Sequence, residues 1–346
     1  MPSEAVAVRR ETGWGFRAAY RFGRFSAVSF SLMTVLAGAA TADPGISLSL
    51  IAGLTIIGIA FHLFAYIHND VCDLPIDRSE PLRQDSPLVM GMIEPKTALA
   101  VAFAQVPLAL GMHLCLGGGF RPGASLAAAF ILLCVYNKWG KRVPMPIVSD
   151  FVQAAGWLAL ATYGALISGR PLNTTTETAL ALIFVYVLMI NGVHGGIRDL
   201  DNDFRCGAQT TAILLGASPD AGCATPLPSP LLTYAFALHG LLIVILALYL
   251  GYNVPGYDPA SRIGTAAIVL GVFAAIAVQV GLALRRSARA SDRTQAGLLH
   301  LVISLGLLYW PFALYFDLPA RIALLAVYAI PVTFMCIYDG IRGGLA

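Results

Sequence analysis

Long apolar runs separated by short polar segments make up most of this chain of 346 residues. A run of about 17–25 apolar residues is long enough to cross a bilayer as a helix. The pattern therefore predicts an all-α, polytopic transmembrane helix bundle. The ten expected spans are residues 25–41, 47–69, 97–116, 123–137, 147–168, 176–197, 231–251, 263–284, 296–315 and 320–340. The fourth is short, and any one of the last four has a re-entrant segment as its alternative.

Composition favours a membrane protein over a soluble one. The chain is 58% hydrophobic and 12% charged, whereas soluble domains carry about 25% charged residues. A net charge of +3, spread along the chain, gives no basis for a nucleic-acid partner. The six cysteines lack the spacing of a zinc site and are expected to be packing residues. We therefore expect membrane lipid to surround the protein.

Basic residues fall mainly on one side of the predicted bundle. With the N-terminus in the cytoplasm, the opposite side receives only four of the 22 Lys and Arg residues, namely Arg121, Arg170, Arg262 and Arg321. Cytoplasmic loops of membrane proteins are enriched in Lys and Arg. The expected organisation is a cytoplasmic N-terminal segment, residues 1–24, followed by a single transmembrane domain, residues 25–346, with both termini cytoplasmic.

An acidic cluster follows the second apolar run, on the predicted cytoplasmic side. Asn69, Asp73 and Asp77 recur every fourth residue, with Asp70 beside them, so a helix would carry the three on one face. Pro75 interrupts the pattern, and we expect the helix to kink or end within the cluster; if Asp77 then points away, Asp70 replaces it. Carboxylates clustered at a membrane interface repel one another. A divalent cation such as Mg²⁺, which prefers oxygen ligands, would offset their charge.

A second acidic cluster follows the sixth apolar run, on the same predicted side. Asp199 and Asp203 are four residues apart, with Asp201 between them. Two carboxylate clusters at one membrane face could hold two Mg²⁺ ions, and the oxygens of a diphosphate would complete their coordination. In an apolar bundle this arrangement favours a substrate with a diphosphate head and a hydrocarbon tail. The alternative is two unrelated acidic turns at the interface.

The two clusters and the residues between them resemble the motifs of the UbiA superfamily of intramembrane prenyltransferases, over nearly the whole sequence. The first family signature, N-x-x-x-D-x-x-x-D, matches Asn69, Asp73 and Asp77, and the PL-x-x-G signature that follows it matches Pro87, Leu88 and Gly91. The Y-x-x-x-K-R signature matches Tyr136, Lys141 and Arg142, here with one extra residue. The last signature, D-x-x-x-D followed by a basic residue, glycine and threonine, matches Asp199, Asp203, Arg205, Gly207 and Thr210.

This resemblance implies a bundle, usually of nine spanning helices against the ten counted here, around a central cavity capped by cytoplasmic loops. It also implies Mg²⁺ and a polyprenyl diphosphate donor. The chain departs from the family pattern at Ser86, Phe204 and Ala208, where basic residues are frequent. The basic residues able to replace them are Arg78, Arg83, Lys141 and Arg142.

Roles at the expected site follow from residue type and position. The metal ligands are expected among Asn69, Asp70, Asp73, Asp77, Asp199 and Asp203, with Asp70 and Asp201 as supplementary ligands or supporting groups. The diphosphate contacts are expected among Arg78, Lys141, Arg142, Arg198 and Arg205. For each arginine, an ordinary anchor at the membrane interface is the alternative.

Polar and aromatic residues within the spans add further candidates. Asp150 is an intramembrane carboxylate, expected to accept the proton lost from the product or to orient an acceptor; the alternative is a carboxylate that faces the helix dipole. Aromatic faces can stabilise an allylic cation, which makes Tyr136, Phe151, Trp157 and Tyr186 candidates, with plain packing as the alternative. His68 and His194 are expected to be packing residues, and Gly192 and Gly196 to permit close helix approach.

Three functions remain open. The first is intermolecular transfer of a prenyl group to a lipophilic, aromatic acceptor, with release of diphosphate. The second is a terpene cyclase of the same superfamily, in which the donor attacks its own double bonds; both need the diphosphate to leave, so the motifs do not separate them. The third is a secondary transporter whose intramembrane carboxylates carry ions.

Overall fold

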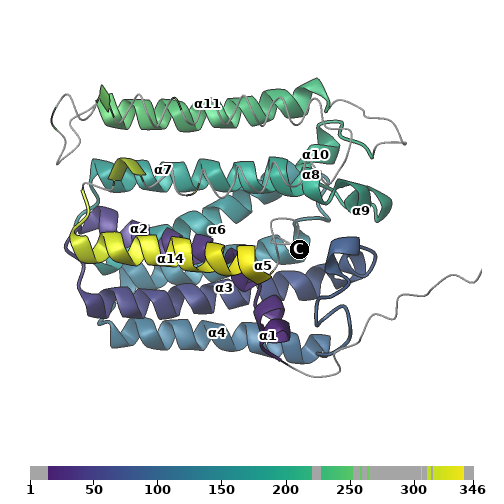
Figure 1. Cartoon of the computed structure of the whole chain (residues 1–346), viewed down its shortest axis with the longest axis horizontal. Helices are drawn as coiled ribbons and strands as arrows, with labels where there is room; N and C mark the ends of the chain where they lie inside the picture. Colours follow the sequence, from purple (N-terminus) through teal and green to yellow (C-terminus); the bar gives the residue numbers. More distant parts are fainter. Residues whose placement is uncertain are drawn as a thin grey trace, which may run out of the picture.

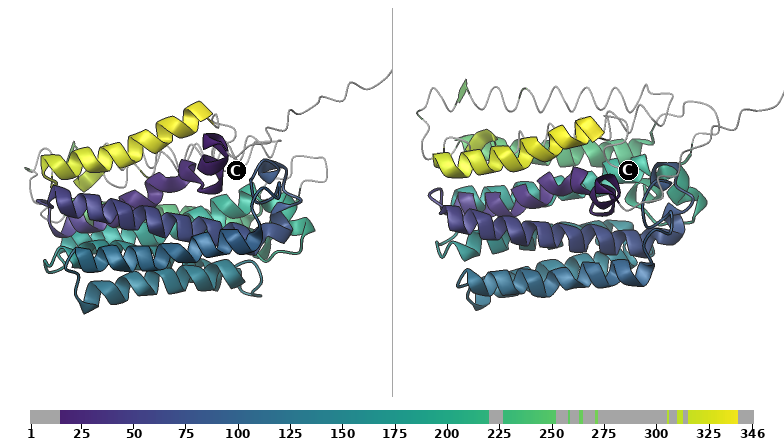
Figure 2. Two further views of the ribbon diagram at one scale, coloured as in Figure 1. Left: turned by 90° about the horizontal axis from the view of Figure 1, so that it is seen from below. Right: turned by 60° about the horizontal axis from the view of Figure 1, so that its bottom comes forward.

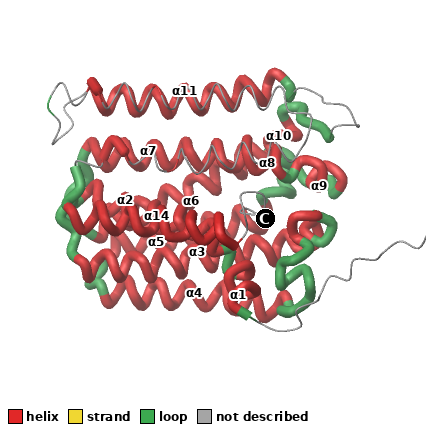
Figure 3. The backbone as a smooth tube through the Cα atoms, viewed as in Figure 1, coloured by secondary structure: helices red, strands yellow, loops and turns green. Residues whose placement is uncertain are grey.

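The computed structural model describes residues 15–219, 227–251 and 315–338, together with positions 258, 263, 264, 271, 305 and 310–312. Within these residues it is an all-helical bundle whose long helices lie side by side along one axis (Figure 1; Figure 3). The long helices are α2 (Val28–Ala42), α3 (Leu48–Asp77), α4 (Pro95–Cys115), α5 (Phe120–Trp139), α6 (Pro146–Ile167), α7 (Thr174–Met189), α11 (Ser229–Gly251) and α14 (Leu318–Tyr338).

Short helical segments connect the long helices. The N-terminal ones are α1 (Phe16–Phe22) and η1 (Phe25–Ala27), and η2 (Pro81–Arg83) follows α3. After α7 the chain forms the π-helical turn η3 (Ile190–Gly195), then α8 (Gly196–Arg198), α9 (Leu200–Arg205) and α10 (Thr211–Leu214). The short η4 (Trp310–Phe312) precedes α14.

The predicted spans correspond to helices wherever the structure describes them. The spans expected at 263–284 and 296–315 lie largely outside the described residues. Six described segments are long and apolar enough to cross a membrane, namely Phe25–Ala42, Leu48–Asp77, Pro95–Cys115, Phe120–Trp139, Thr174–Arg198 and Ser229–Gly251. Helix α6, which carries the polar Asp150 and Gln153 near its start, is not among them. The chain is thus a multi-pass membrane protein, while its orientation stays a prediction.

Helix α3 does not end at Pro75. It continues through the proline and ends at Asp77, with Arg78 as its C-cap. Proline removes one backbone hydrogen-bond donor. Because Pro75 lies in the last turn of α3, few further backbone hydrogen bonds follow it, and the helix tolerates the loss. Asn69, Asp73 and Asp77 all line one cavity, so Asp77 does not point away, which was the alternative that the sequence had left open.

Helix α2 occupies the middle of the bundle. Nearly all of its residues are buried, and it packs against α3, α6, α7 and α14; the rotated views show α14 lying along it (Figure 2). Small residues let α2 and α6 approach closely. A Cβ added at Gly38 would lie 2.0 Å from the carbonyl oxygen of Ala161, and one added at Gly164 would lie 2.1 Å from that of Val35.

Enlarging this crossing should destabilise the protein. Gly38→Val places a side chain against helix backbone, which cannot move aside, so we expect a loss of about 3 kcal/mol or more. Thermal unfolding in detergent micelles measures the effect. Gly111→Val is the matched control, because Gly111 has open space around its Cα on the exposed face of α4. Equal shifts in Tm for the two variants would contradict the close α2–α6 crossing.

Candidate active site

The segments that follow α3 and α7 meet at one end of the bundle (Figure 1). Ser79 Oγ donates to Asn202 Oδ1 over 2.9 Å, and Asn202 Nδ2 donates to the carbonyl of Ile76 over 2.9 Å. These bonds join the two acidic motifs directly. A cavity of about 270 Å³ lies beside them, lined by α2, α3, α5, α6, α7 and the turns after α7.

Acidic residues from both motifs line this cavity. Asp73 and Asp77 come from α3, and Asp199 and Asp203 from the segment after α7. Asn69 also lines it and donates from Nδ2 to Asp73 Oδ2 over 3.2 Å. Residues more than 120 positions apart in the sequence thus present five oxygen-bearing side chains to one space.

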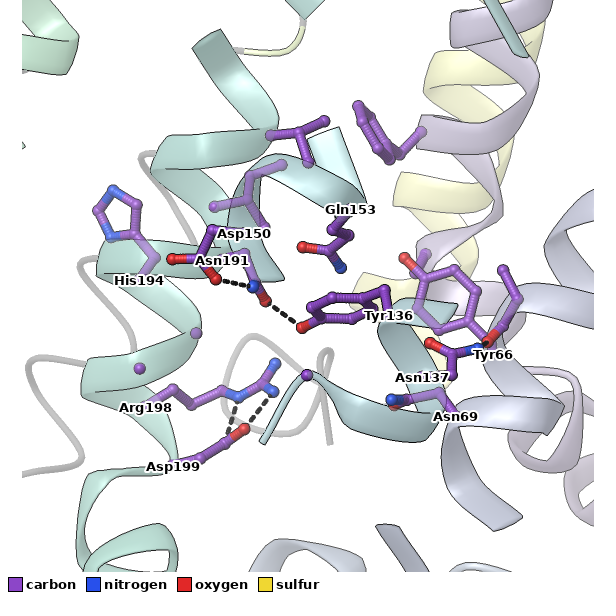
Figure 4. Close-up of a pocket in the computed structure, with 18 of the residues that line it drawn as sticks. Tyr66, Asn69, Tyr136, Asn137, Asp150, Gln153, Asn191, His194, Arg198 and Asp199 are labelled. Atoms are coloured by element: carbon purple, nitrogen blue, oxygen red, sulfur yellow. Dashed lines mark hydrogen bonds and ion pairs between the residues drawn. The ribbon is translucent and has the colours of Figure 1, made fainter. Parts of the chain in front are cut away.

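Two basic side chains neutralise these carboxylates. Lys141 Nζ lies 2.9 Å from Asp203 Oδ1 and 3.9 Å from Asp73 Oδ2, so it bridges the two motifs. Arg198 donates from Nε and Nη2 to the two oxygens of Asp199, over 2.6 and 2.7 Å (Figure 4). Both cations line the cavity, where they could equally contact an anionic ligand.

The charges of these groups follow from their surroundings. Burial lowers the pKa of Lys141, but Asp73, Asp199 and Asp203 raise it more, so its net shift is upward. Burial raises the pKa of Asp199, but the Arg198 guanidinium overcomes this effect and the net shift is downward. For Asp203, burial dominates over the Lys141 ammonium and the pKa is raised. Lys141 and Asp199 are therefore held in their charged forms, whereas burial favours the neutral form of Asp203.

Two further arginines complete the edge of the cavity: Arg83, which the sequence offered only as a replacement for missing cations, and Arg24, which it did not single out. Arg24 and Arg83 both line it. Arg24 Nε donates to Asp70 Oδ2 over 3.2 Å, and its Nη2 pairs with Oδ1 of the same carboxylate. Arg83 lies 3.8 Å from Asp70 and 3.9 Å from Asp77. The expected division of the chain at residue 24 therefore falls at a cavity-lining residue.

Four residues expected at the site do not line the cavity. Arg78, Arg142 and Arg205 are exposed. Arg142 Nη2 donates to the carbonyl of Cys72 over 2.8 Å, and Arg205 Nε to that of Asp201 over 3.1 Å, so both turn toward the outer backbone of the motifs. Asp70 is buried but faces Arg24 rather than the cavity. The prediction that these four contact the ligand directly is not supported by their positions.

A second polar network, centred on Asp150, lies further inside (Figure 4). Asp150, 3% exposed, accepts hydrogen bonds from Asn191 Nδ2 and Thr211 Oγ1, each over 2.5 Å. Tyr136 Oη donates to Asn191 Oδ1 over 2.8 Å. Asp150 thus bonds across to other elements and is not a cap of its own helix. Gly192 permits this approach, because a Cβ there would lie 2.8 Å from Asp150 Oδ2.

The π-helical turn η3 carries Asn191 and His194 into the cavity. Such turns widen a helix by one residue and re-aim its side chains. His194, expected to be a packing residue, lines the cavity, whereas His68 lies outside it with Nδ1 3.3 Å from Asn137 Nδ2. Gly196 packs closely as predicted, since a Cβ there would lie 2.8 Å from that of Ala212.

Aromatic rings form the inner wall of the cavity. Trp157 and Tyr186 line it, as does Phe30, whose ring centroid lies 4.5 Å from that of Trp157 and 5.8 Å from that of Tyr186. Phe151 is 47% exposed and does not line the cavity, so its predicted contact with a cation is not supported. Phe30 was not expected from the sequence. The cavity is thus charged at its edge and aromatic inside.

The donor set at the edge fits Mg²⁺. Among the described residues no group of three or more His, Cys, Asp and Glu side chains forms a cage by itself. Mg²⁺ does not need one, because it keeps several waters and binds through one or two carboxylates plus the phosphates of a substrate. Asp73 with Asp77, and Asp199 with Asp203, supply two such carboxylate pairs.

Comparison with known proteins places this geometry in context. The sequence pattern of the UbiA prenyltransferase family matches residues 31–254. A digeranylgeranylglyceryl phosphate synthase from Sulfolobus acidocaldarius is 30% identical over 151 residues, which cover 44% of this chain and 52% of that protein. Its counterpart from Pyrococcus abyssi is 32% identical over 148 residues, covering 43% and 50%. The matched part thus spans about half the length of these relatives.

Solved structures share the fold. A UbiA homologue from Archaeoglobus fulgidus bound to GPP and Mg²⁺ superposes with a TM-score of 0.63 at 16% identity, covering 85% of this chain and 98% of that one. The apo structure of a UbiA homologue from Aeropyrum pernix K1 superposes with a TM-score of 0.56, also at 16% identity, covering 89% and 97%. At these identities the likeness establishes the fold.

Proposed function

Because the chain belongs to the UbiA prenyltransferase family, we propose that it ionises a polyprenyl diphosphate in a Mg²⁺-dependent reaction and transfers the prenyl group to a lipophilic acceptor. The observation that carries this proposal is the layering of one cavity. Its edge holds two carboxylate pairs with Lys141, Arg198, Arg24 and Arg83, and its interior is aromatic. A substrate with an anionic head and a hydrocarbon tail matches both layers.

The diphosphate head binds at the charged edge. Asn69, Asp73 and Asp77 on one side, and Asp199 and Asp203 on the other, are the residues that would hold Mg²⁺, which supplies positive charge to the leaving diphosphate. Lys141 and Arg198 add fixed positive charge at the same edge. When the allylic carbon–oxygen bond breaks, negative charge develops on the diphosphate, so these groups stabilise the transition state more than the ground state.

The prenyl tail extends into the aromatic interior. Phe30, Trp157 and Tyr186 exclude water there, and water would otherwise capture the allylic cation. Their faces, together with that of Tyr136, can stabilise the cation as the diphosphate leaves. This assignment retains three of the four aromatic residues predicted from the sequence and adds Phe30.

The acceptor is proposed to bind beside Asp150. The hydrogen-bond partners of this carboxylate in the described part of the chain, Asn191 and Thr211, are neutral, so a group that donates a hydrogen bond is favoured there over a second anion. An alcohol or a phenol meets this requirement. The relatives are named for a glyceryl phosphate product, so an alcohol acceptor stands beside the aromatic acceptor expected from the sequence.

Incubating membranes that contain the protein with Mg²⁺ and geranyl, farnesyl or geranylgeranyl diphosphate tests the function. We expect diphosphate release that depends on an added alcohol or phenol acceptor and stops with EDTA. A cyclic hydrocarbon or alcohol formed without acceptor would establish the cyclase alternative instead. Release that persists in EDTA would contradict the metal-dependent mechanism.

The carboxylates lie at one end of the bundle rather than at its middle, where transporter sites tend to lie, which argues against a transporter.

A further inference from the structure

Arg24 lies at the break between α1 and η1 in an unusual backbone conformation. Its φ of 46° and ψ of 42° are left-handed, and among the described residues it is the only non-glycine residue with a positive φ. This conformation costs free energy for a residue with a Cβ, so other contacts must hold it. The side chain is 11% exposed and lines the cavity.

His62 on α3 fixes the backbone at this break. Its ring is fully buried, with Nε2 2.9 Å from the carbonyl oxygen of Gly23 and 3.1 Å from that of Arg24. Because carbonyl oxygens only accept, Nε2 carries the proton and donates to them. Nδ1 then accepts from the hydroxyl of Ser31, over 2.9 Å. The imidazole thus ties α3, α2 and the α1–η1 break together.

The next two turns of α3 fix the side chain. The guanidinium carbon of Arg24 lies 5.5 Å from the ring centroid of Tyr66, and both Nε and Nη2 contact the carboxylate of Asp70. His62, Tyr66 and Asp70 are each four residues apart, so they lie on one face of the helix. One stripe of α3 therefore holds both the backbone and the side chain of Arg24.

We propose that Arg24 contacts the diphosphate of the bound donor, and that His62, Tyr66 and Asp70 are positioning residues that hold it there, a role that rests on the proposed function. Asp70 is then the partner of Arg24 rather than a metal ligand. Unlike Asp73 and Asp77, Asp70 does not line the cavity. Arg83, 3.8 Å from the same carboxylate, places a second cation beside Arg24.

The direct test is binding of inorganic pyrophosphate with Mg²⁺ to the purified protein in detergent, measured by calorimetry, alongside KM and kcat for the prenyl diphosphate. Arg24→Gln should weaken pyrophosphate binding and raise KM by about 10- to 100-fold, the range of a charge-assisted hydrogen bond. Arg24→Lys keeps the charge without the bidentate contact and should lose less. Arg170→Gln, an arginine paired with Asp43 and 66% exposed, is the matched control and should change neither quantity.

A double-mutant cycle tests the positioning role. His62→Gln should weaken pyrophosphate binding less than Arg24→Gln does, and should add nothing in the Arg24→Gln background, because its effect passes through Arg24. Asp70→Asn should behave in the same way. His113→Gln removes a buried histidine that packs against Gly118 and is the matched control. Losses that multiply in the double variants would overturn the positioning role of these residues.

The outcomes separate this proposal from the proposed function. Wild-type protein that binds Mg²⁺–pyrophosphate with Arg24-dependent affinity but turns over no prenyl diphosphate would overturn the function and support the anion contact. Turnover and binding that are unchanged in Arg24→Gln would overturn the Arg24 contact alone. If Arg24→Gln does not fold, Arg24→Lys decides: wild-type affinity together with wild-type KM in that variant would overturn the contact.

Discussion

Asp73→Asn should lower kcat/KM for the prenyl diphosphate by about a thousand-fold, which corresponds to the several kcal/mol that a metal ion contributes to stabilising a leaving phosphate. The substitution keeps the size of the side chain and its hydrogen bond with Asn69. What it removes is one negative charge from the carboxylate pair that would hold Mg²⁺. Steady-state kinetics on protein that elutes as a single species from size exclusion measure the effect.

Asp43→Asn is the matched control for this prediction. Asp43 follows α2 at the other end of the bundle and pairs with Arg170 over 3.4 Å, so it shares residue type and ion pairing but not the cavity. We expect wild-type kinetics from it. An Asp73→Asn variant within threefold of wild type would contradict a role for α3 in holding the metal.

Asp150→Asn should slow prenyl transfer by about 100- to 10,000-fold, the range of general acid–base contributions, while leaving the KM for the donor within about twofold. The reason is spatial: Asp150 bonds to Asn191 and Thr211 in the interior, away from the ion pairs at the edge. Its loss removes the base or the orienting group for the acceptor but not the diphosphate contacts. Product formation and slow donor hydrolysis should be measured in the same incubation.

Thr211→Val refines this prediction. It removes one hydrogen bond to Asp150 and should lower the transfer rate by about tenfold, near the free energy of a single hydrogen bond. Thr34→Val, which removes a hydroxyl that bonds to the carbonyl of Phe30 on its own helix, is the control. An Asp150→Asn variant that transfers at the wild-type rate, or that loses donor binding instead, would refute the acceptor role.

Local sequence patterns predicted much of the fold. Each apolar run in the described residues forms a helix near its predicted bounds, because burying or embedding a long apolar segment leaves the helix as the only way to satisfy its backbone. The four-residue spacing of Asn69, Asp73 and Asp77 likewise survives Pro75, since the proline sits in the last turn of α3. The predicted topology then placed the segments after α3 and α7 at the same membrane face, and the family motifs agreed with this pairing.

The sequence did not correctly predict which arginines line the cavity. Arg78, Arg142 and Arg205 stand in or next to the motifs but do not line the cavity, while Arg24 and Arg83 stand outside the motifs and line it. A side chain several bonds long can turn either way from the same backbone position. The only sequence signal for Arg24 is the four-residue spacing of His62, Tyr66 and Asp70 on α3, which gains meaning once Arg24 is seen against it.

By itself, the sequence determined that this chain is a multi-pass helical membrane protein and predicted that Asp73, Asp77, Asp199 and Asp203 share one site, because helix formation and residue spacing are local properties. The tertiary structure alone decided which cations meet these carboxylates, that Asp70 holds Arg24, and that Asp150 bonds to Asn191 and Thr211 in the interior. The contacts of Arg24 with Asp70, of Lys141 with Asp203, and of Asp150 with Asn191 and Thr211 join residues 41 to 62 positions apart. Their partners are chosen by the packing of helices, which no local pattern encodes.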